Sequence, residues 1–529
     1  TTCSTFCSML ISTSELAKMS GSELVIGGLR DDGSNSEDAQ NSTATNGDIY
    51  VNALTTANTS GFTNGVQLNV NAHLSGSKGA IIFEGSASTF SALTANAVDG
   101  IEVNSDLTTT TGALSLDGDS DSTVDTLSGN DNILFASGTT LTSAGNITLS
   151  AASGGMVTAG DLTLSAPSSI TMTGTMSGTG DISLSASNGI TLNNGISTSS
   201  GSLNINANSS TLTLGSGATF SSTNALTLAA SSTTSSGDLT LTSSASTISV
   251  NNALVSAGAV TMTASTGLTL SNSTLTGSGN ISLQGGSSLS LASGTTITSS
   301  AGNITLGASG GSITANGALT LSSNGSITVS NALTATGAAT LNANSGITLG
   351  NSFTANGAVA LDADLDNNGT GDFTISSGTL STTSNALTLT ANDLILTGSL
   401  NSGTGSTTIN VSDGGSLGIG FSSGFGMNLT TTEQANIIGT GDLSLVNGSI
   451  TISASNSLSA SGKLTIGQSG GTITGQGALT LSGAKGLAIN SSITSAGNLI
   501  LEGDSNNSAD SDDSISLASG TSLIASAGS

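Results

Sequence analysis

The chain has 529 residues, including 72 Gly, one Pro and no Trp, and only 2% of its residues are aromatic. This composition does not suit several globular domains with aromatic-rich cores. With 35% hydrophobic and 7% charged residues, it does not match the usual signature of disorder either. We therefore expect a chain that is ordered by repetition.

The formal net charge is −27, because 32 acidic residues stand against 5 basic ones that are scattered singly. Nucleic acids and anionic membrane surfaces are bound by clustered Lys and Arg, which the sequence lacks. No window approaches the roughly 20 apolar residues that span a bilayer. We expect neither nucleic-acid binding nor membrane insertion, and we expect cations to be the electrostatic partners.

Both cysteines, Cys3 and Cys7, lie near the first residue. They are too few for a disulfide framework, although the pair could close a small loop in an oxidising compartment. Sequence alone does not establish the geometry of a bridge, so both states stay open. The chain begins with Thr1 and shows no leader, which predicts a processed chain or an excerpt.

A short helical turn is predicted at residues 14–21, because Ser14 and Glu15 form a capping-type opening. A strand is expected after it, at residues 24–26. The same arrangement recurs at residues 432–439, before an expected strand at 443–445. The two segments therefore predict a duplicated local structure.

From about residue 140 onward the chain repeats one phrase, in which Gly and a polar or small residue precede alternating apolar and Thr or Ser positions. Gly145-Asn-Ile-Thr-Leu149 and Gly180-Asp-Ile-Ser-Leu184 are examples. Such alternation predicts strands whose apolar side chains point inward and whose Thr and Ser point outward. Shorter strand-like pieces lie between the phrases, so each coil should hold two or three strands joined by Asn, Gly and Ser turns.

The phrases also recur as larger modules with the same uneven spacing. Gly145, Gly160 and Gly180 return as Gly302, Gly317 and Gly337, and again as Gly462, Gly477 and Gly497. We place modules at residues 137–291, 292–456 and, truncated, 457–529, after an N-terminal segment at 1–136 that carries acidic inserts. Stacked coils share a narrow core and pair their backbones in parallel, so we predict an all-β fold, one continuous parallel β-helix (β-solenoid) with coils of about 20 residues.

The Gly-x-Leu-Thr-Leu phrases, the opening at residues 14–21 and the stretch at 107–116 resemble the giant filamentous-haemagglutinin-like surface proteins of bacteria, over nearly the whole chain. The resemblance implies a right-handed parallel β-helix that is exported across the outer membrane. It also implies work in adhesion or in building surface fibres.

Three acidic inserts, each after a strand phrase, gather the ligand-type residues. The middle one matches the start of a calcium loop, Asp-x-Asp-x-Asn-Gly, but Ile375 stands where such a loop has a bidentate Glu. The alternative is a solvated loop that keeps the surface soluble. The candidate calcium ligands are Asp362, Asp364, Asp366, Asn368 and Asp372 in the middle insert, Asp117, Asp119, Asp121 and Asp125 in the first, and Asp504, Asn506, Asp510, Asp512 and Asp513 in the third.

Paired carboxylates could also belong to a carbohydrate-active β-helix enzyme. Sugar-processing grooves usually offer aromatic platforms and basic residues, whereas this chain has one Tyr and isolated Lys. His73, the sole histidine, is expected to be a turn residue. Outward Thr240 and Thr242 raise an ice-binding alternative, which the uneven coil lengths disfavour. We expect no enzymatic activity.

The sequence favours a structural or adhesive component of a bacterial cell-surface or extracellular filament. Its repetitive Ser, Thr and Asn surfaces would make weak, multivalent contacts. The alternative is a passive spacer within a longer adhesin whose tip binds the receptor. Expected partners are other copies or neighbouring segments of the same giant protein, cell-surface glycans or other cells, and the expected location is secreted or on the outer-membrane exterior. Calcium is the only cofactor considered.

Overall fold

The computed structural model describes residues 9–27, 48–70, 79–122, 131–272, 274–454, 456–508 and 513–526. Its strands pair in parallel between coils about 21 residues apart, as Ile170 does with Ile190 and Ile190 with Leu212. The predicted all-β parallel β-solenoid is therefore confirmed. The right-handedness implied by the family resemblance stays a prediction.

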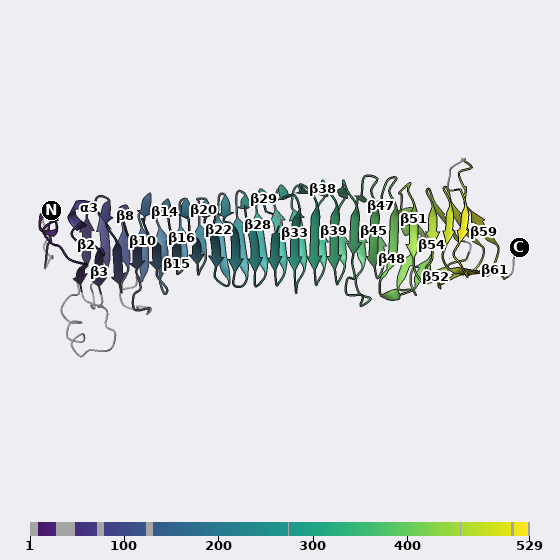
Figure 1. The fold of residues 1–529 in the computed structure, drawn as a ribbon, viewed down its shortest axis with the longest axis horizontal. Coiled ribbons are helices and arrows are strands. Elements are labelled where there is room, and N and C mark those ends of the chain that lie inside the picture. Colours follow the sequence, from purple (N-terminus) through teal and green to yellow (C-terminus); the bar gives the residue numbers. More distant parts are fainter. Residues whose placement is uncertain are drawn as a thin grey trace. The chain divides into compact units, whose positions relative to one another are not determined.

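Contacts within the chain define two units. Within each of them, strands of successive coils lie side by side (Figure 1). Unit 1 comprises residues 1–258 and 262–265, and unit 2 comprises residues 259–261 and 266–529. The strand β28 (Val260–Ala264) is shared between them. The two units are defined by contacts within the chain, whereas the modules at 137–291, 292–456 and 457–529 are defined by repetition in the sequence. The module boundaries therefore stay predictions.

In unit 1 most coils contribute one strand to each of three sheets. The first sheet consists of β1 (Leu24–Gly27), β3 (Val66–Val70), β6 (Leu93–Ala97), β9 (Leu114–Asp117), β12 (Ile147–Ser150), β15 (Ile170–Thr173), β18 (Ile190–Leu192), β21 (Thr211–Leu214), β24 (Ser232–Ser235) and β27 (Ala253–Ser256). The second consists of β2 (Ile49–Asn52), β4 (Ile81–Glu84), β7 (Ile101–Val103), β10 (Asn132–Phe135), β13 (Gly155–Thr158), β16 (Met176–Gly178), β19 (Ile196–Thr198), β22 (Ala218–Ser222) and β25 (Leu239–Ser243). The third consists of β5 (Ser88–Phe90), β8 (Leu107–Thr109), β11 (Thr139–Thr142), β14 (Leu162–Ala166), β17 (Ile182–Ala186), β20 (Leu203–Asn206), β23 (Leu226–Ala229) and β26 (Ile248–Val250).

Unit 2 begins with the same three-sheet plan. Its first sheet consists of β30 (Thr274–Gly277), β33 (Thr295–Ser299), β36 (Leu319–Ser323), β39 (Ala339–Ala343), β42 (Val359–Asp362), β45 (Leu387–Ala391), β48 (Thr407–Val411), β51 (Leu443–Val446), β54 (Leu464–Ile466), β57 (Leu487–Ile489) and β60 (Ile515–Leu517). The second consists of β31 (Ile281–Gly285), β34 (Ile304–Ala308), β37 (Ile327–Val329), β40 (Ile347–Leu349), β43 (Phe373–Ile375) and β46 (Leu394–Leu396). The third consists of β29 (Gly267–Leu270), β32 (Ser288–Leu291), β35 (Ser312–Ala315), β38 (Leu333–Ala335), β41 (Phe353–Ala355), β44 (Thr379–Ser381) and β47 (Ser399–Asn401).

An irregular segment interrupts this plan after β48. It contains the 3-10 helix η1 (Ser412–Gly414), two strands that pair with each other, and α4 (Thr431–Ala435). Two further sheets then accompany the first: β50 (Met427–Leu429), β49 (Leu417–Ile419), β52 (Ser449–Ile452), β55 (Thr472–Gly475), β58 (Ser492–Ser495) and β61 (Leu523–Ala525) in one, and β53 (Asn456–Ala460), β56 (Leu479–Gly483) and β59 (Leu499–Glu502) in the other.

Three short α-helices accompany the strands that the structure describes, α1 (Thr13–Leu16), α3 (Thr56–Thr59) and α4. Helices α1 and α4 carry the same capping box, formed by Ser12 with Glu15 and by Thr430 with Glu433. Both predicted helical turns, and the strands β1 and β51 that follow them, are therefore confirmed. The capping residues were predicted two positions too late, because Ser12 caps α1 where Ser14 was expected and Thr430 caps α4 where Thr432 was expected. Among the described residues, no helix combines the length and apolar character of a membrane span.

The core consists of the alternating apolar residues, such as Ile304 and Leu306, which are fully buried. The expectation that Ser and Thr point outward is wrong at the coil corners. There Ser323 is buried and donates to the carbonyl oxygen of Gly302 at 2.7 Å, and Ser495 donates to that of Gly477 at 2.8 Å. The chain turns at these corners, so carbonyl groups that leave the strand ladder need another donor.

At some of the phrases the opening glycine is required by the spacing of the coils. A Cβ atom added at Gly201 would lie only 2.0 Å from the carbonyl oxygen of Gly180 in the preceding coil. The corners of neighbouring coils thus touch through their backbones, and no side chain fits between them.

Candidate functional site: the three acidic loops

The three acidic inserts share one loop conformation. In each, an aspartate stands two residues after the end of a strand, and the residue three positions later has a positive φ between 52° and 57°. The N–H of that later residue donates to the aspartate's own carbonyl oxygen at 2.9 to 3.4 Å. The pairs are Asp119 with Ser122, Asp364 with Asn367, and Asp504 with Asn507.

Asp364 organises the middle loop and is fully buried. Its Oδ1 accepts from the N–H of Asn368 at 3.1 Å, and its Oδ2 accepts from the N–H of Gly369 at 3.0 Å and from the hydroxyl of Ser412 at 2.6 Å. Desolvation by burial alone would raise the pKa of Asp364, but these hydrogen bonds together outweigh it and hold the pKa below its usual value. The carboxylate therefore binds protein donors on both oxygens.

The other predicted ligands of the middle loop also have partners within the chain. Asp362 accepts from the N–H of Asp364 at 3.2 Å, and burial raises the pKa of Asp362. Asp366 accepts from the amide of Asn368 at 2.9 Å, and Asp372 accepts from the amide of Asn392 at 3.1 Å. The side chains of Asp366 and Asn368 are exposed.

The structure brings two residues to this loop that the sequence did not indicate. A Cβ atom at Gly369 would lie 3.6 Å from Asp413 Oδ2 and 4.0 Å from Asn392 Oδ1. Both residues come from later coils that stack beside the loop. No local spacing signal could have found them, because the stacking of β42, β45 and β48 decides which residues meet.

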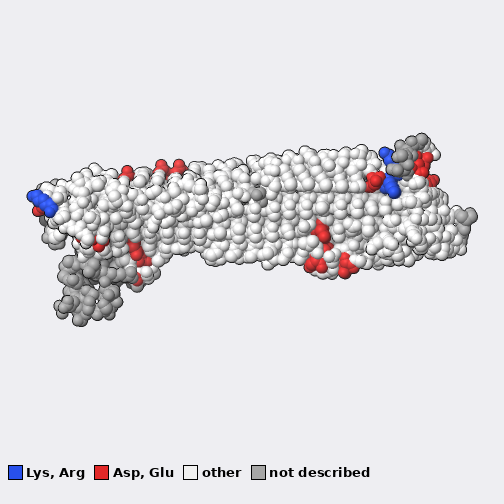
Figure 2. All heavy atoms as spheres, in the orientation of Figure 1, with Lys and Arg blue, Asp and Glu red and all other residues white. Residues whose placement is uncertain are grey.

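Asp393 follows Asn392 in the chain and accepts hydrogen bonds from Asn428, a residue of the irregular segment. Its Oδ1 accepts from the N–H of Leu394 at 2.9 Å and from the N–H of Asn428 at 2.8 Å. Burial is the main cause that raises the pKa of Asp393, against these hydrogen bonds. On the face that Figure 2 shows, acidic side chains gather in a few small groups, and most of the surface between these groups is uncharged.

In the first insert, Asp119 is buried, and its Oδ2 accepts from the N–H of Ser153 at 2.6 Å. Its Oδ1 is buried without a hydrogen-bond partner among the described residues. Asp117 accepts from the N–H of Asp119 at 3.3 Å, and Asp121 is half-buried. Asp99, which the sequence did not single out, is also buried and accepts from the N–H of Gly79 at 2.8 Å.

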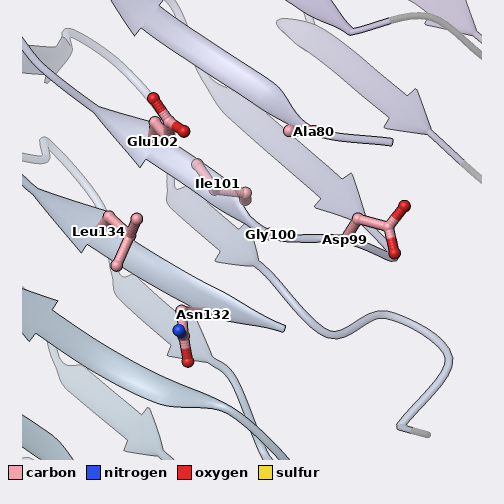
Figure 3. A pocket seen from close by; sticks show the side chains of 7 residues that line it. All are labelled: Ala80, Asp99, Gly100, Ile101, Glu102, Asn132 and Leu134. Carbon is pink, nitrogen blue, oxygen red and sulfur yellow. The ribbon is translucent and has the colours of Figure 1, made fainter. Parts of the chain in front are cut away.

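A shallow depression lies over the start of the second sheet in unit 1 (Figure 3). Its volume is about 10 Å³, which is room for roughly one water molecule. Ligand pockets usually measure about 300–1,000 Å³. It is lined by Ala80, Asp99, Gly100, Ile101, Glu102, Asn132 and Leu134.

The described residues of the third insert are mostly exposed. Asp504 and Asn506 are exposed, and both accept from the N–H of Ser508, at 3.2 and 3.0 Å. Asp513 lies at the end of this loop. Several predicted residues lie outside the described ranges, namely Cys3, Cys7, His73, Asp125, Asp510 and Asp512.

These loops are held together mainly by carboxylates that accept from backbone N–H groups. Within the ranges that the structure describes, no three His, Cys, Asp or Glu side chains come together as a metal site would need. Calcium binding by the predicted ligands stays a prediction. Asp366 and Asp413, which flank Gly369, are the carboxylates to examine first.

Comparison with known proteins gives no relative: no protein family, no curated protein and no solved structure matches the chain. The likeness to filamentous-haemagglutinin-like proteins therefore rests on the sequence phrases and on the parallel β-solenoid that it implied. The solenoid is compatible with that family.

Proposed function

We propose that the chain is a structural and adhesive component of a bacterial cell-surface or extracellular filament. One observation carries the proposal: outward threonines align from coil to coil. On the second sheet of unit 2, Thr305, Thr328, Thr348 and Thr374 are partners in consecutive strand pairs. Thr314, Thr334 and Thr354 do the same on the third sheet.

Each ladder presents one hydroxyl per coil, at the strand spacing of about 4.8 Å. A single hydroxyl contact is weak because it exchanges a hydrogen bond with water for another one. Many equal contacts in fixed positions act together, since each binding event raises the effective concentration for the next. This kind of surface suits a partner that is itself repetitive, such as a cell-surface glycan layer.

The test compares beads that carry the 529-residue chain at high and low density, applied to glycan-coated surfaces and to bacterial cells. We expect retention that rises steeply with density. The double variant Thr328→Val and Thr348→Val removes two neighbouring hydroxyls and keeps the branched shape, so it should weaken retention. The double variant Thr320→Val with Thr340→Val changes a pair on the first sheet. Comparing its retention with that of the first double variant shows whether one face of the solenoid accounts for most of the binding.

If dense beads are not retained on any surface, the adhesive part of the proposal fails and the passive-spacer alternative takes its place. We do not propose an enzymatic role.

A further inference from the structure

Two aromatic side chains of unit 2 are left partly open to solvent. Of the ten phenylalanines in the sequence, Phe6 lies outside the described residues and seven others are buried in the core. The remaining two, Phe421 and Phe425, are half-buried and contact each other, with ring centroids 4.8 Å apart and an angle of 49° between the rings. The placement of this pair therefore differs from that of every other described phenylalanine.

The backbone that carries the two rings is held firmly at both ends of its loop, residues 420–426. Gly420 begins the loop with a φ of 81°, and a Cβ atom there would lie only 2.1 Å from Ser453 Oγ. At the other end, Asn428 Oδ1 accepts from the N–H of Phe425 at 3.2 Å, and Asn428 Nδ2 donates to the carbonyl oxygen of Phe425 at 3.1 Å. The rings are thus positioned without a ligand, which reduces the entropy that binding would cost.

The ring of Phe425 lies over the outward face of β49. Gly418 is the outward residue of this strand, since Leu417 and Ile419 on either side of it are buried in the core. A Cβ atom at Gly418 would lie 2.2 Å from Phe425 Cδ2. Only glycine leaves room for the ring at this position.

A row of hydroxyl groups continues from the ring pair along the same face. Gly418 pairs with Thr451, Thr451 with Thr474, and Thr474 with Thr494. Thr474 and Thr494 are exposed, and Thr451 is half-buried. One coil therefore contributes the aromatic surface, and the following coils contribute one hydroxyl each at the strand spacing of about 4.8 Å.

We propose that Phe421, Phe425 and this threonine row bind a neutral carbohydrate chain. A pyranose ring has a face that carries C–H groups, whose partial positive charge is attracted to the electron-rich face of an aromatic ring. The sugar hydroxyls lie around the rim of the pyranose and exchange hydrogen bonds with the threonines. Stacking on the rings orients one sugar, and the hydroxyl row follows the next sugars of the chain.

The charge of the protein selects a neutral carbohydrate. No basic residue occurs between residues 393 and 451, and the net charge of the chain is −27. Carboxylate, sulfate and phosphate groups of anionic glycans are usually bound by Arg and Lys, and a negative field repels them. The inference deepens the proposed adhesive function and rests on it, because the ring pair adds one oriented contact to the many weak contacts of the threonine ladders.

The experiment is saturation-transfer NMR of the whole chain with soluble oligosaccharides. Oligomers of glucose, galactose and N-acetylglucosamine are the neutral probes, and oligogalacturonate is the anionic one. We expect transfer to the ring C–H protons of at least one neutral probe and none to oligogalacturonate. Phe421→Leu keeps an apolar side chain but removes the aromatic face, so it should weaken the affinity for that probe about fivefold. Phe421→Trp should bind the probe at least as tightly as the wild-type chain.

Two further variants complete the test. Thr474→Val removes one hydroxyl of the row and keeps the branched shape, so it should also weaken binding. Val255→Ala is the control, because it removes an exposed apolar side chain of unit 1 and should leave the affinity unchanged. The proposal is overturned if no neutral probe shows transfer, if oligogalacturonate binds equally well, or if Phe421→Leu binds like the wild-type chain.

Bead retention separates this inference from the adhesive function. If wild-type beads are retained and Phe421→Leu beads are retained equally, adhesion stands and the role of the ring pair is wrong. If oligosaccharide binding depends on Phe421 but dense beads are not retained on any surface, the carbohydrate site stands and the adhesive function is wrong.

Discussion

The backbone contact between coil corners makes a quantitative prediction for Gly201→Ala. The new Cβ atom would lie 2.0 Å from the carbonyl oxygen and 2.1 Å from the carbonyl carbon of Gly180. Ordinary contacts begin near 3.4 Å, so the two coils would have to separate locally by about 1.4 Å. Neighbouring strands are only about 4.8 Å apart, and this displacement is too large for their hydrogen bonds to absorb.

We expect Gly201→Ala to destabilise the neighbouring coils by about 3 kcal/mol, the upper end of the range for overpacking. Solenoids loosen locally, so the effect should be concentrated in β17 and β20, which pair through Ile182 and Leu203. Hydrogen exchange read by mass spectrometry should show peptides from these strands exchanging about a hundredfold faster. Gly448→Ala is the control, because nothing lies within 4 Å of its Cβ position. Equal protection in both variants would refute the close backbone contact.

Three further predictions concern the corners and loops. Ser323→Ala removes the donor to Gly302 and should lower the free energy of unfolding by about 1 kcal/mol in urea titration, whereas the outward Ser322→Ala should not. The pKa of Asp364 is lowered in the folded state, so its contribution to stability is present above the ordinary carboxyl pKa and is lost as pH falls through the folded pKa. The pKa of Asp393 is raised in the folded state, so its contribution to stability is lost as pH rises through the folded pKa. Melting curves of Asp364→Asn and Asp393→Asn across acidic pH should each lose the matching slope, and unchanged slopes would contradict the assignment. Calcium should raise the melting temperature if the middle loop binds it. The double variant Asp366→Asn with Asp413→Asn should abolish both that rise and the luminescence of bound terbium. If calcium does not raise the melting temperature of the wild-type chain, the calcium prediction is wrong.

Much of the fold was predictable because a strand with one buried face has a strict period of two. The phrase at residues 145–149 predicted β12, and the Ser-Glu and Thr-Glu openings at residues 14–15 and 432–433 predicted α1 and α4, although the residues that cap these helices are Ser12 and Thr430. These signals are local, so the sequence contains them in full. The acidic loops were also correctly placed after strands, since each begins two residues beyond a strand end.

The remaining features depend on which coils lie next to each other. Ser323 is polar but occupies an inward position of β36, in step with Leu319 and Leu321, and it is buried there because its hydroxyl reaches the carbonyl oxygen of Gly302 in the preceding coil. Asp413 reaches the loop around Gly369 because it follows β48, which pairs with β45, and β45 in turn pairs with β42, the strand before that loop. The pairing of β49 with both β50 and β52 reverses the order along the chain, and no periodic pattern indicates such a reversal.

The corners also explain why acidic residues occur outside the three inserts. Asn303 Oδ1 accepts from the N–H of Ser326 in the next coil at 2.8 Å, and Asp181 Oδ1 accepts from the N–H of Ser202 at 2.7 Å. Both side chains perform the same task, which needs an acceptor oxygen but no charge. Asp and Asn are therefore interchangeable at this position as far as coil stacking is concerned. Part of the −27 net charge therefore comes from aspartates that serve as hydrogen-bond acceptors at the coil corners. The net charge alone does not indicate cation binding, which has to be measured for each acidic loop.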